Sequence, residues 1–465
     1  MKVVLTHGYF IAEDEKEQKI MRPYPPLGIL YLSAFLKEQQ IENEIFDSTF
    51  SDKKSLVNYL KDKKPEILAI YTNLMTKLNV LDVIKQAKEL IPNVKVVLGG
   101  PDVTYNTKDY LDNGADFIVI GEGENTMHEL ADAILRKESD FSNINGIAFL
   151  EGDKEVKTKP RIKAREIDDL PTPNRDGIDI SKYLKAWKDH HGESALNVST
   201  QRGCPYTCKW CSTAVYGQSY RRRSAEKVVQ ELREINEKYK PDTIWFVDDV
   251  FTVSHKWLNS FADELEKQQV RVKFECISRA DRMNSEVIKT LKRAGCFRVW
   301  IGAESGSQKI IDAMDRRVSV DKVRQIIQET RQEGIQAGTF IMLGYPGETE
   351  EDINETIHHL KMSNPDHFTI TVAYPIKGTS LYDEIENIQT EKLEWNKTTD
   401  RDRDFVRTYP RKYYDYAVTK VVNEVNYYKR KTEGKIDLQL IKLKTKSVLS
   451  GISMSLYRSK LFKGR

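Results

Sequence analysis

The chain has 465 residues, 39% of them hydrophobic and 31% charged, which describes a globular protein too long to fold around one core. Its 73 Lys and Arg against 70 Asp and Glu give a net charge of only +3, which argues against a general polyanion-binding surface and hence a nucleic-acid partner. No stretch reaches the roughly 20 apolar residues of a membrane span, and no signal peptide is evident. We therefore expect a cytoplasmic protein of two or three domains.

Residues 1–140 predict a first domain of alternating strands and helices. Runs such as "EILAIYT" and "VKVVLGG" alternate with helical patterns such as "VLDVIKQAKELI". This order predicts parallel βαβ units and hence an open, doubly wound, Rossmann-like α/β sheet. Ligands of such sheets bind beyond the carboxyl ends of the strands, where this chain has "GGPD" (99–102) and "GEGE" (121–124). Glycines there would let a flat ligand or a phosphate approach the backbone, although plain turns are the alternative.

Residues 141–194 predict a linker that contains a hairpin. The hairpin is expected to turn at Gly152, and Pro171 and Pro173 interrupt the segment after the hairpin.

Residues 195–380 predict six further strand and helix units, which favour a partial (β/α)6, TIM-like barrel. Enzymes of this architecture gather their active sites at the carboxyl ends of the strands. In this chain those ends carry a cysteine-rich loop and three pairs of residues, namely Asp248 with Asp249, Ser278 with Arg279, and Gly302 with Glu304.

Residues 381–465 predict a mainly helical C-terminal region with a basic tail. From Arg430 onward the chain has ten basic and two acidic residues. The tail is either solvated or in peripheral contact with an anionic membrane surface. The aromatic segment before it packs over the barrel mouth or shapes the substrate site.

The cysteine-rich loop holds three of the five cysteines, Cys204, Cys208 and Cys211, with the spacing C-x-x-x-C-x-x-C and no fourth cysteine nearby. Structural zinc usually takes four ligands from spaced pairs, whereas a four-iron, four-sulfur (4Fe–4S) cluster can be held by three thiolates with one iron open. The spacing therefore favours the cluster, with zinc as the alternative. Cys276 and Cys296 lie in or beside predicted strands and are expected to be small buried hydrophobes.

This spacing, with Trp210 before the last cysteine and a β/α series around it, resembles the radical S-adenosylmethionine (radical SAM) superfamily. The first domain, with "PPLGILYLSAFLK" (25–37), "LGGPD" and "IGEGE", resembles the cobalamin-binding domain of one branch of that superfamily. This branch contains cobalamin-dependent methylases and related anaerobic oxidative cyclases. The two resemblances together cover roughly residues 1–380.

The resemblance implies that the three clustered cysteines ligate a 4Fe–4S cluster whose open iron holds S-adenosylmethionine. It implies SAM contacts at Trp210, Asp248, Asp249, Ser278, Arg279, Gly302 and Glu304. The two aspartates stand where the family more commonly has a motif ending in Gly-Gly-Glu, and a carboxylate facing the methionyl ammonium is retained. The "IMLGYPGE" segment (341–348) resembles the part of the barrel that packs on the adenine.

The resemblance also implies a cobalamin site in the first domain. Its expected residues are Thr72, Asn73, Leu74 and Met75 under the ring, and Gly99, Gly100, Asp102, Gly121, Glu122, Gly123 and Glu124 along the nucleotide tail. Proteins that ligate cobalt through histidine carry D-x-H-x-x-G after the first strand. His7 lacks the preceding aspartate and the later glycine, so we expect no histidine on cobalt.

The implied activity is that of an enzyme. A flavodoxin or ferredoxin reduces the cluster, S-adenosylmethionine is cleaved, and the resulting 5′-deoxyadenosyl radical takes a hydrogen atom from an unactivated carbon of a small-molecule or lipid-like substrate. In a methylase that carbon then receives a methyl group from cobalamin, and in an oxidative cyclase or rearrangement enzyme of the anaerobic tetrapyrrole type it does not. A corrinoid-binding sensor with a structural cluster is the non-enzymatic alternative. The residues do not indicate the substrate or a general acid or base.

Overall fold

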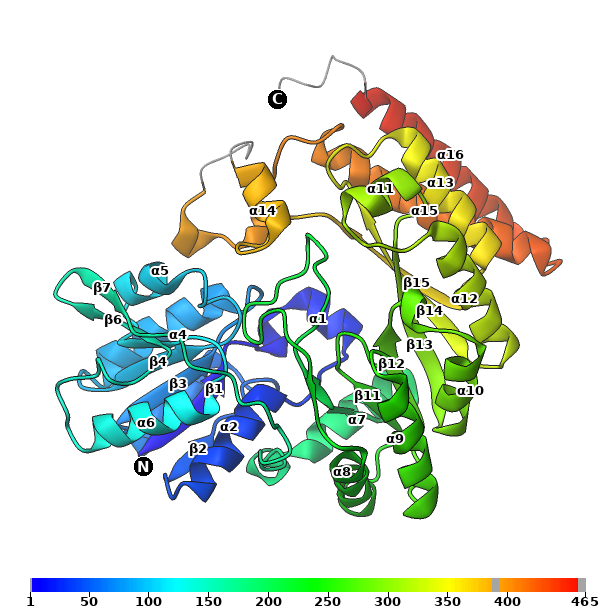
Figure 1. Cartoon of the computed structure of the whole chain (residues 1–465). Helices are drawn as coiled ribbons and strands as arrows, with labels where there is room; N and C mark the ends of the chain where they lie inside the picture. Colours follow the sequence, from blue (N-terminus) through cyan, green and yellow to red (C-terminus); the bar gives the residue numbers. More distant parts are fainter. Residues whose placement is uncertain (1, 387–392, 459–465) are drawn as a thin grey trace. The chain divides into compact units, whose positions relative to one another are not determined.

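The computed structural model describes residues 2–386 and 393–458, which form two compact units. The described parts of the first unit are residues 2–205, 212–245 and 393–402. Those of the second unit are residues 206–211, 246–386 and 403–458. Figure 1 shows the helices and strands of each unit in chain order.

The first unit is built on a seven-stranded sheet with the order β2-β1-β3-β4-β5-β6-β7. Its strands are β1 (Val3–His7), β2 (Asn43–Ile45), β3 (Ile67–Tyr71), β4 (Lys95–Gly99), β5 (Phe117–Val119), β6 (Ile147–Glu151) and β7 (Lys154–Lys157). Strands β1 to β5 pair in parallel, which confirms the predicted α/β sheet.

The predicted hairpin turns at Gly152, but it belongs to this sheet and not to a separate linker. β6 pairs antiparallel with β5, and β7 pairs antiparallel with β6. The reason is burial, because Ile147, Ala148 and Phe149 of β6 enter the two hydrophobic cores of the sheet.

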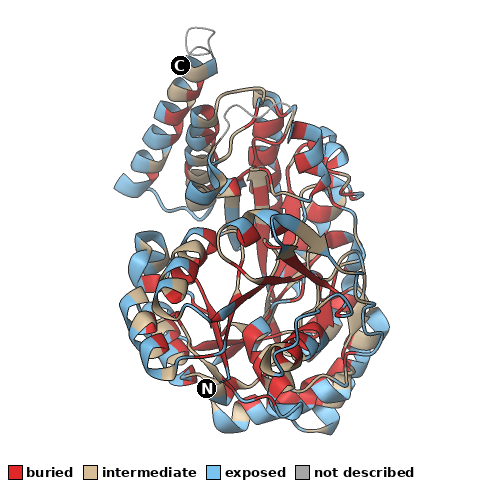
Figure 2. Cartoon of the chain, turned by 90° about the vertical axis from the view of Figure 1, so that its left-hand side faces the viewer, coloured by how far each residue is buried: buried red, intermediate tan, exposed pale blue. Residues whose placement is uncertain are grey.

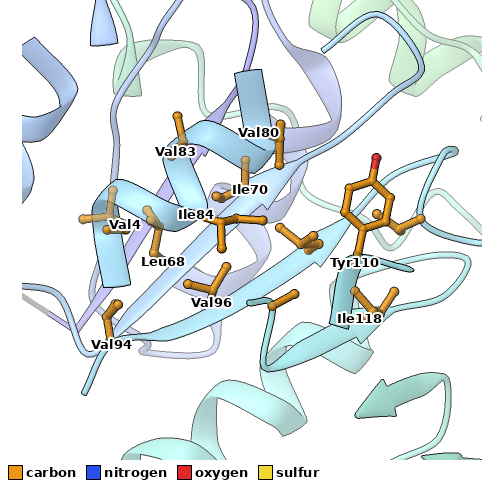
Figure 3. Close-up of a cluster of buried hydrophobic side chains, with 14 of the residues drawn as sticks. Val4, Leu68, Ile70, Val80, Val83, Ile84, Val94, Val96, Tyr110 and Ile118 are labelled. Carbon is orange, nitrogen blue, oxygen red and sulfur yellow. The ribbon is translucent and has the colours of Figure 1, made fainter. Parts of the chain in front are cut away.

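Both faces of the sheet are covered, as a parallel sheet requires. Successive strand residues alternate between the cores, so that Leu68 and Val96 lie in one core while Ile67 and Val97 lie in the other. Figure 3 shows the first core, where Val80, Val83 and Ile84 pack on the strands. The helices here are α1 (Glu15–Ile20), α2 (Leu27–Glu38), α3 (Lys53–Lys63), α4 (Lys77–Leu90), α5 (Thr107–Asp112) and α6 (Glu124–Leu135), with a 3-10 turn η1 (Ile11–Glu13).

The rest of the first unit leads into the cysteine-rich loop. It contains η2 (Arg175–Gly177), α7 (Ile180–His191), β8 (Ala195–Val198), β9 (Gln201–Arg202), β10 (Arg221–Arg222), α8 (Ala225–Lys238) and β11 (Thr243–Phe246), with η5 (Trp395–Lys397) and η6 (Asp400–Asp402) from later in the chain. β9 and β10 form an antiparallel pair on either side of the loop in sequence. Gly203 has φ +83, and a Cβ there would lie 2.4 Å from the Ser219 carbonyl oxygen, so this turn requires glycine.

A second sheet has six strands in the order β15-β14-β13-β12-β11-β8, which confirms the predicted partial barrel. Its later strands are β12 (Phe274–Ser278), β13 (Cys296–Glu304), β14 (Gln336–Leu343) and β15 (His367–Val372), all paired in parallel. The alternating helices are α9 (His255–Lys267), α10 (Ser285–Arg293), α11 (Gln308–Ala313), α12 (Val320–Gln332) and α13 (Glu350–Ser363), with η3 (Ala280–Arg282) after β12.

The C-terminal region is helical, as predicted. It consists of α14 (Ser380–Ile385), α15 (Arg411–Thr432) and α16 (Leu438–Arg458). The last two pack against each other, and α13 packs against α15. The part of the chain that the structure describes contains no helix with the length and apolar character needed to cross a membrane.

Candidate active site

Cys208 lies among arginine side chains in the second unit. Its side chain is buried, and its sulfur accepts hydrogen bonds from Arg279 Nη1 at 3.3 Å and Arg316 Nη1 at 3.7 Å. The pKa of Cys208 is lowered to about 5 by a hydrogen bond from the Cys211 thiol and by the two guanidinium charges, which together outweigh desolvation. The site therefore favours a thiolate, which is the form of cysteine that binds iron.

The two arginines are held in place by other contacts. Arg279, at the end of β12, donates from Nε to Asp281 at 2.9 Å and from Nη2 to the Arg316 carbonyl at 2.7 Å. Its guanidinium also lies 4.0 Å from the centre of the Tyr206 ring. Arg316, after α11, donates from Nη2 to the Gly302 carbonyl at 3.0 Å. Their positions are therefore set before any ligand binds.

The end of β13 brings Gly302 and Glu304 to the same place. Glu304 is buried, lies 3.5 Å from Arg316 and has φ +64, in the left-handed region that non-glycine residues seldom adopt. Burial raises the pKa of this carboxyl group. A Cβ on Gly302 would lie 2.2 Å from Arg316 Nη2, so a side chain at this position would displace the guanidinium.

The other predicted SAM contacts occupy different surroundings. Trp210 packs against the hydrophobic cluster that contains Met314 and Tyr345, with Arg316 5.8 Å from its ring centre. The Ser278 hydroxyl is buried in a hydrogen bond with the Thr252 hydroxyl.

At the end of β11, Asp248 is buried whereas Asp249 is exposed. In the loop, Cys211 is exposed and Cys204 is half-buried. The structure thus brings Cys208, Arg279, Gly302 and Glu304 together, and all of the SAM contacts stay predictions.

Arg316 is not among the site residues predicted from the sequence. Its only local signal is a short basic pair, Arg316 and Arg317, after the helix that follows β13. That signal does not distinguish a buried arginine from a solvated one.

In the first unit, the ends of β3 and β4 lie side by side. Tyr71 is paired with Gly99, and the Thr72 N–H donates to the Gly99 carbonyl at 2.8 Å. Gly100 has φ +115, and a Cβ there would lie 2.3 Å from the Thr72 carbonyl oxygen, so the turn cannot accept a side chain. Gly100 therefore allows the ends of β3 and β4 to pack closely, and the approach of a large flat ligand to these glycines stays a prediction.

The segment after β3 forms a tight turn into α4. The Asn73 side-chain oxygen accepts from the backbone N–H groups of Met75 and Thr76, at 2.9 Å and 3.1 Å. Leu74 is half-buried, whereas Met75 is 47% exposed. These positions are compatible with the predicted contact under a corrin ring.

The two glutamates of the "GEGE" loop have arginine partners. Arg202 forms ion pairs with both Glu122 and Glu124, and Arg221 pairs with Glu122. Gly121, with φ +85, and Gly123 leave the backbone of the loop without side chains. The carboxylates therefore anchor this loop to the strands that flank the cysteine-rich segment.

Because both carboxylates are paired with arginines, the predicted cobalamin contacts at Glu122 and Glu124 would be made by the backbone, and they stay predictions. Arg202 is not among the residues predicted from the sequence, although it lies two residues before Cys204. Asp102, the last predicted contact, accepts a hydrogen bond from the buried Tyr110 hydroxyl.

His7 is buried and both of its ring nitrogens are engaged. Nε2 lies 3.1 Å from Asp47, and Nδ1 accepts from the Tyr9 N–H at 3.2 Å. His7 is therefore engaged within the fold, and the expectation that no histidine reaches cobalt stays a prediction.

The residues present fit the predicted cofactors. The lowered pKa of Cys208 favours its thiolate form, and the chain has glycines without side chains at the end of β4. In the described residues no three His, Cys, Asp or Glu side chains are spaced for a single metal ion. Cluster thiolates bind different irons and need not converge on one point.

Two family models match this chain, one in its first domain and one in the barrel. The Radical SAM superfamily model matches residues 198–360, and the B12 binding domain model matches residues 19–131. An uncharacterized methyltransferase of Pyrococcus horikoshii is 32% identical over 384 residues, which are 81% of this chain and 82% of that protein. The chain belongs to the cobalamin-binding radical SAM enzymes. The prediction of an enzyme with a 4Fe–4S cluster, S-adenosylmethionine and cobalamin as cofactors is thereby confirmed.

More distant relatives of this radical SAM enzyme differ in their reactions. An anaerobic magnesium-protoporphyrin IX monomethyl ester cyclase of Cereibacter sphaeroides is 25% identical, over 85% of this chain and 65% of the cyclase. The hopanoid C-3 methylase of Methylococcus capsulatus is 24% identical, over 78% of this chain and 68% of the methylase.

Solved structures share the fold of this radical SAM enzyme. The cobalamin-dependent enzyme OxsB superposes with a TM-score of 0.74 at 17% identity, covering 98% of this chain and 72% of OxsB. TsrM from Kitasatospora setae superposes with a TM-score of 0.70 at 17% identity, covering 83% of this chain and 75% of TsrM.

Proposed function

We propose that this enzyme is a C-methyltransferase that methylates an unactivated carbon of a small-molecule or lipid-like substrate. The observation that carries the proposal is the Cys208 thiol held between Arg279 and Arg316 in a chain that also has a B12-binding sheet. The relative named as a methyltransferase aligns with most of its own length, which favours methylation over cyclisation.

The cofactors supply the radical and the methyl group when they are bound. The chain's own contribution is charge and position. Arg279 and Arg316 stabilise the thiolate form of Cys208, Asp248 offers a carboxylate to the methionyl ammonium of S-adenosylmethionine, and Glu304 lies near the same ligand. We place the reaction in the cytoplasm, with a flavodoxin or ferredoxin as electron donor.

The product ratio tests this proposal. A methylase uses S-adenosylmethionine twice per turnover, so it yields 5′-deoxyadenosine and S-adenosylhomocysteine in near-equal amounts. The purified, cobalamin-loaded and reduced protein would be incubated with methyl-labelled S-adenosylmethionine and a metabolite and lipid extract of its host. We expect label in an extract component and both products, with Cys208→Ala as the background control.

An oxidative cyclase is the second candidate, because a relative named as such a cyclase aligns with 85% of this chain. It would yield 5′-deoxyadenosine with neither S-adenosylhomocysteine nor transferred label. That result would replace the methylase proposal.

A further inference from the structure

Helix α16 buries one face and leaves the opposite face apolar and exposed. Leu440, Ser447, Ser450 and Met454 are its buried residues. The exposed apolar stripe, defined here by side chains that are between 50% and 85% exposed, consists of Leu438, Ile441, Val448, Leu449, Ile452 and Leu456. Figure 2 shows buried and exposed residues on different sides of the helix that leads to the C-terminus.

The stripe follows the period of the helix. At about 100° per residue its six members fall within about 100° of arc, opposite the buried residues. α16 packs on α15, and one of the buried residues, Ser447, donates a hydrogen bond to Glu424 of α15 at 2.8 Å. The apolar stripe is therefore not required for packing within the second unit, and its members stay exposed in the whole structure.

Lysines lie on both sides of the exposed apolar stripe. Lys442 and Lys446 are exposed on one side of it and Lys444 on the other, and the chain has no acidic residue after Asp437. Lys444 reaches back to Glu424 of α15 at 3.0 Å, and Glu424 also pairs with Lys361. The solvent-facing side of α16 is thus apolar at its centre and positively charged at its margins.

We propose that α16 docks flat on an anionic lipid membrane through the exposed apolar stripe and its flanking lysines. Aliphatic side chains enter the boundary of the acyl chains, while lysines remain at the headgroups and meet their negative charge. The 21 residues of the helix span about 31 Å at about 1.5 Å per residue, so the stripe can lie along the surface.

The charge of α16 favours an anionic surface over a second copy of the chain. Two copies joined through this face would bring lysines together, and α16 has no acidic residue to pair with them. An anionic bilayer supplies the opposite charge along the whole length of the helix. This proposal does not depend on which reaction the enzyme catalyses.

Vesicle sedimentation of the full-length protein tests the proposal. We expect binding to vesicles of equal parts phosphatidylcholine and phosphatidylglycerol at low salt, weaker binding at high salt, and little binding to phosphatidylcholine alone. Leu449→Gln combined with Ile452→Gln should abolish sedimentation. The control Ile162→Gln changes a 93% exposed side chain elsewhere and should sediment like the unchanged protein.

A second pair of variants tests the charge. Lys442→Gln combined with Lys446→Gln should weaken binding about 25-fold, because each basic residue near an anionic surface contributes about fivefold. Lys54→Gln combined with Lys61→Gln on α3 removes the same charge from another exposed helix and should have no effect.

Circular dichroism would confirm that all the variants are folded, and light scattering would give their mass. The proposal is overturned if the protein does not sediment with anionic vesicles, or if the α3 lysine variant loses as much binding as the α16 variant. It is also overturned if the protein is a dimer that Leu449→Gln with Ile452→Gln converts to a monomer. That last result would assign the stripe to a second copy of the chain.

Discussion

Two buried arginine pairs in this protein have different partners. In the first unit, Arg175 and Arg223 both bond to Glu231, which is 1% exposed. In the second unit, Arg279 and Arg316 both donate to Cys208. A carboxylate can accept hydrogen bonds from both arginines, so that both arginines of the first pair have a charged partner. A thiolate that accepts such bonds can still bind an iron atom through its sulfur. The first pair therefore holds the fold, and the second prepares a site for a ligand.

The pKa values of the acids beside the two arginine pairs, Glu231 and Glu304, shift in opposite directions. Burial by itself would raise the pKa of Glu231, but Arg175 and Arg223 hold it below its usual value. Glu304 has Arg316 nearby at 3.5 Å, and burial raises its pKa. Both acids are buried, so the guanidinium groups of Arg175 and Arg223 outweigh desolvation at Glu231, whereas desolvation prevails at Glu304.

The largest effect is expected at the thiol of the second pair. Cys208→Ala should lose both the brown cluster absorbance and all 5′-deoxyadenosine formation, because two protein thiolates hold a cubane poorly. Both are measured after anaerobic reconstitution. Cys296→Ala, at a buried cysteine outside the loop, should keep both, and loss of the cluster in that variant would show that the ligand assignment is wrong.

Removing the carboxylate that the first arginine pair shares should lower the free energy of unfolding. Glu231→Gln leaves two guanidinium groups buried beside a neutral amide, and we expect a loss of about 3–5 kcal/mol in the free energy of unfolding. Urea titration measures it. Glu237→Gln, at an exposed position of the same helix, is the control and should change stability by less than about 0.5 kcal/mol. An equal loss in both variants would contradict the structural role of Glu231.

A conservative change in the second pair should affect activity more than stability. Arg316→Lys keeps the charge but cannot bond both the Gly302 carbonyl and the Cys208 sulfur as the guanidinium does. We expect 5′-deoxyadenosine formation to fall about 10- to 100-fold while the cluster is retained. The neighbouring Arg317→Lys, at an exposed side chain, should be active. Full activity of Arg316→Lys would show that charge alone suffices.

A pH-dependent effect is expected from a buried acid of the second unit. Glu348 accepts the Gly344 N–H at 2.5 Å, and burial raises its pKa to about 8. Between about pH 4.5 and pH 8 the folded protein keeps a proton that the unfolded chain has lost, so this group makes stability fall as pH rises.

Glu348→Gln removes that titration and should be more stable than the unchanged protein at pH 8 and similar to it below pH 4.5. Thermal unfolding across this pH range measures the difference. Glu355→Gln, at an exposed position of α13, serves as the control. An unchanged pH dependence in Glu348→Gln would show that Glu348 is ionised in the folded state.

The sequence by itself determined the features that depend on neighbouring residues. The alternation of strands and helices predicted both sheets, Gly152 predicted the hairpin turn, and the spacing of Cys204, Cys208 and Cys211 predicted the cluster loop. The glycines at 99, 100 and 302 were predicted to lie at or near the carboxyl ends of strands, and they do. Each is a local signal, because backbone conformation and ligand spacing are set within a few residues.

Only the tertiary structure decided which distant side chains meet. Arg316 reaches Cys208 across 108 residues, and Arg202 reaches Glu124 across 78. The β6–β7 hairpin pairs with the edge of the first sheet, and packing on α15 determines which face of α16 is buried. Such contacts depend on how whole elements pack, and a residue's local pattern is the same whether its side chain finds a buried partner or remains in water.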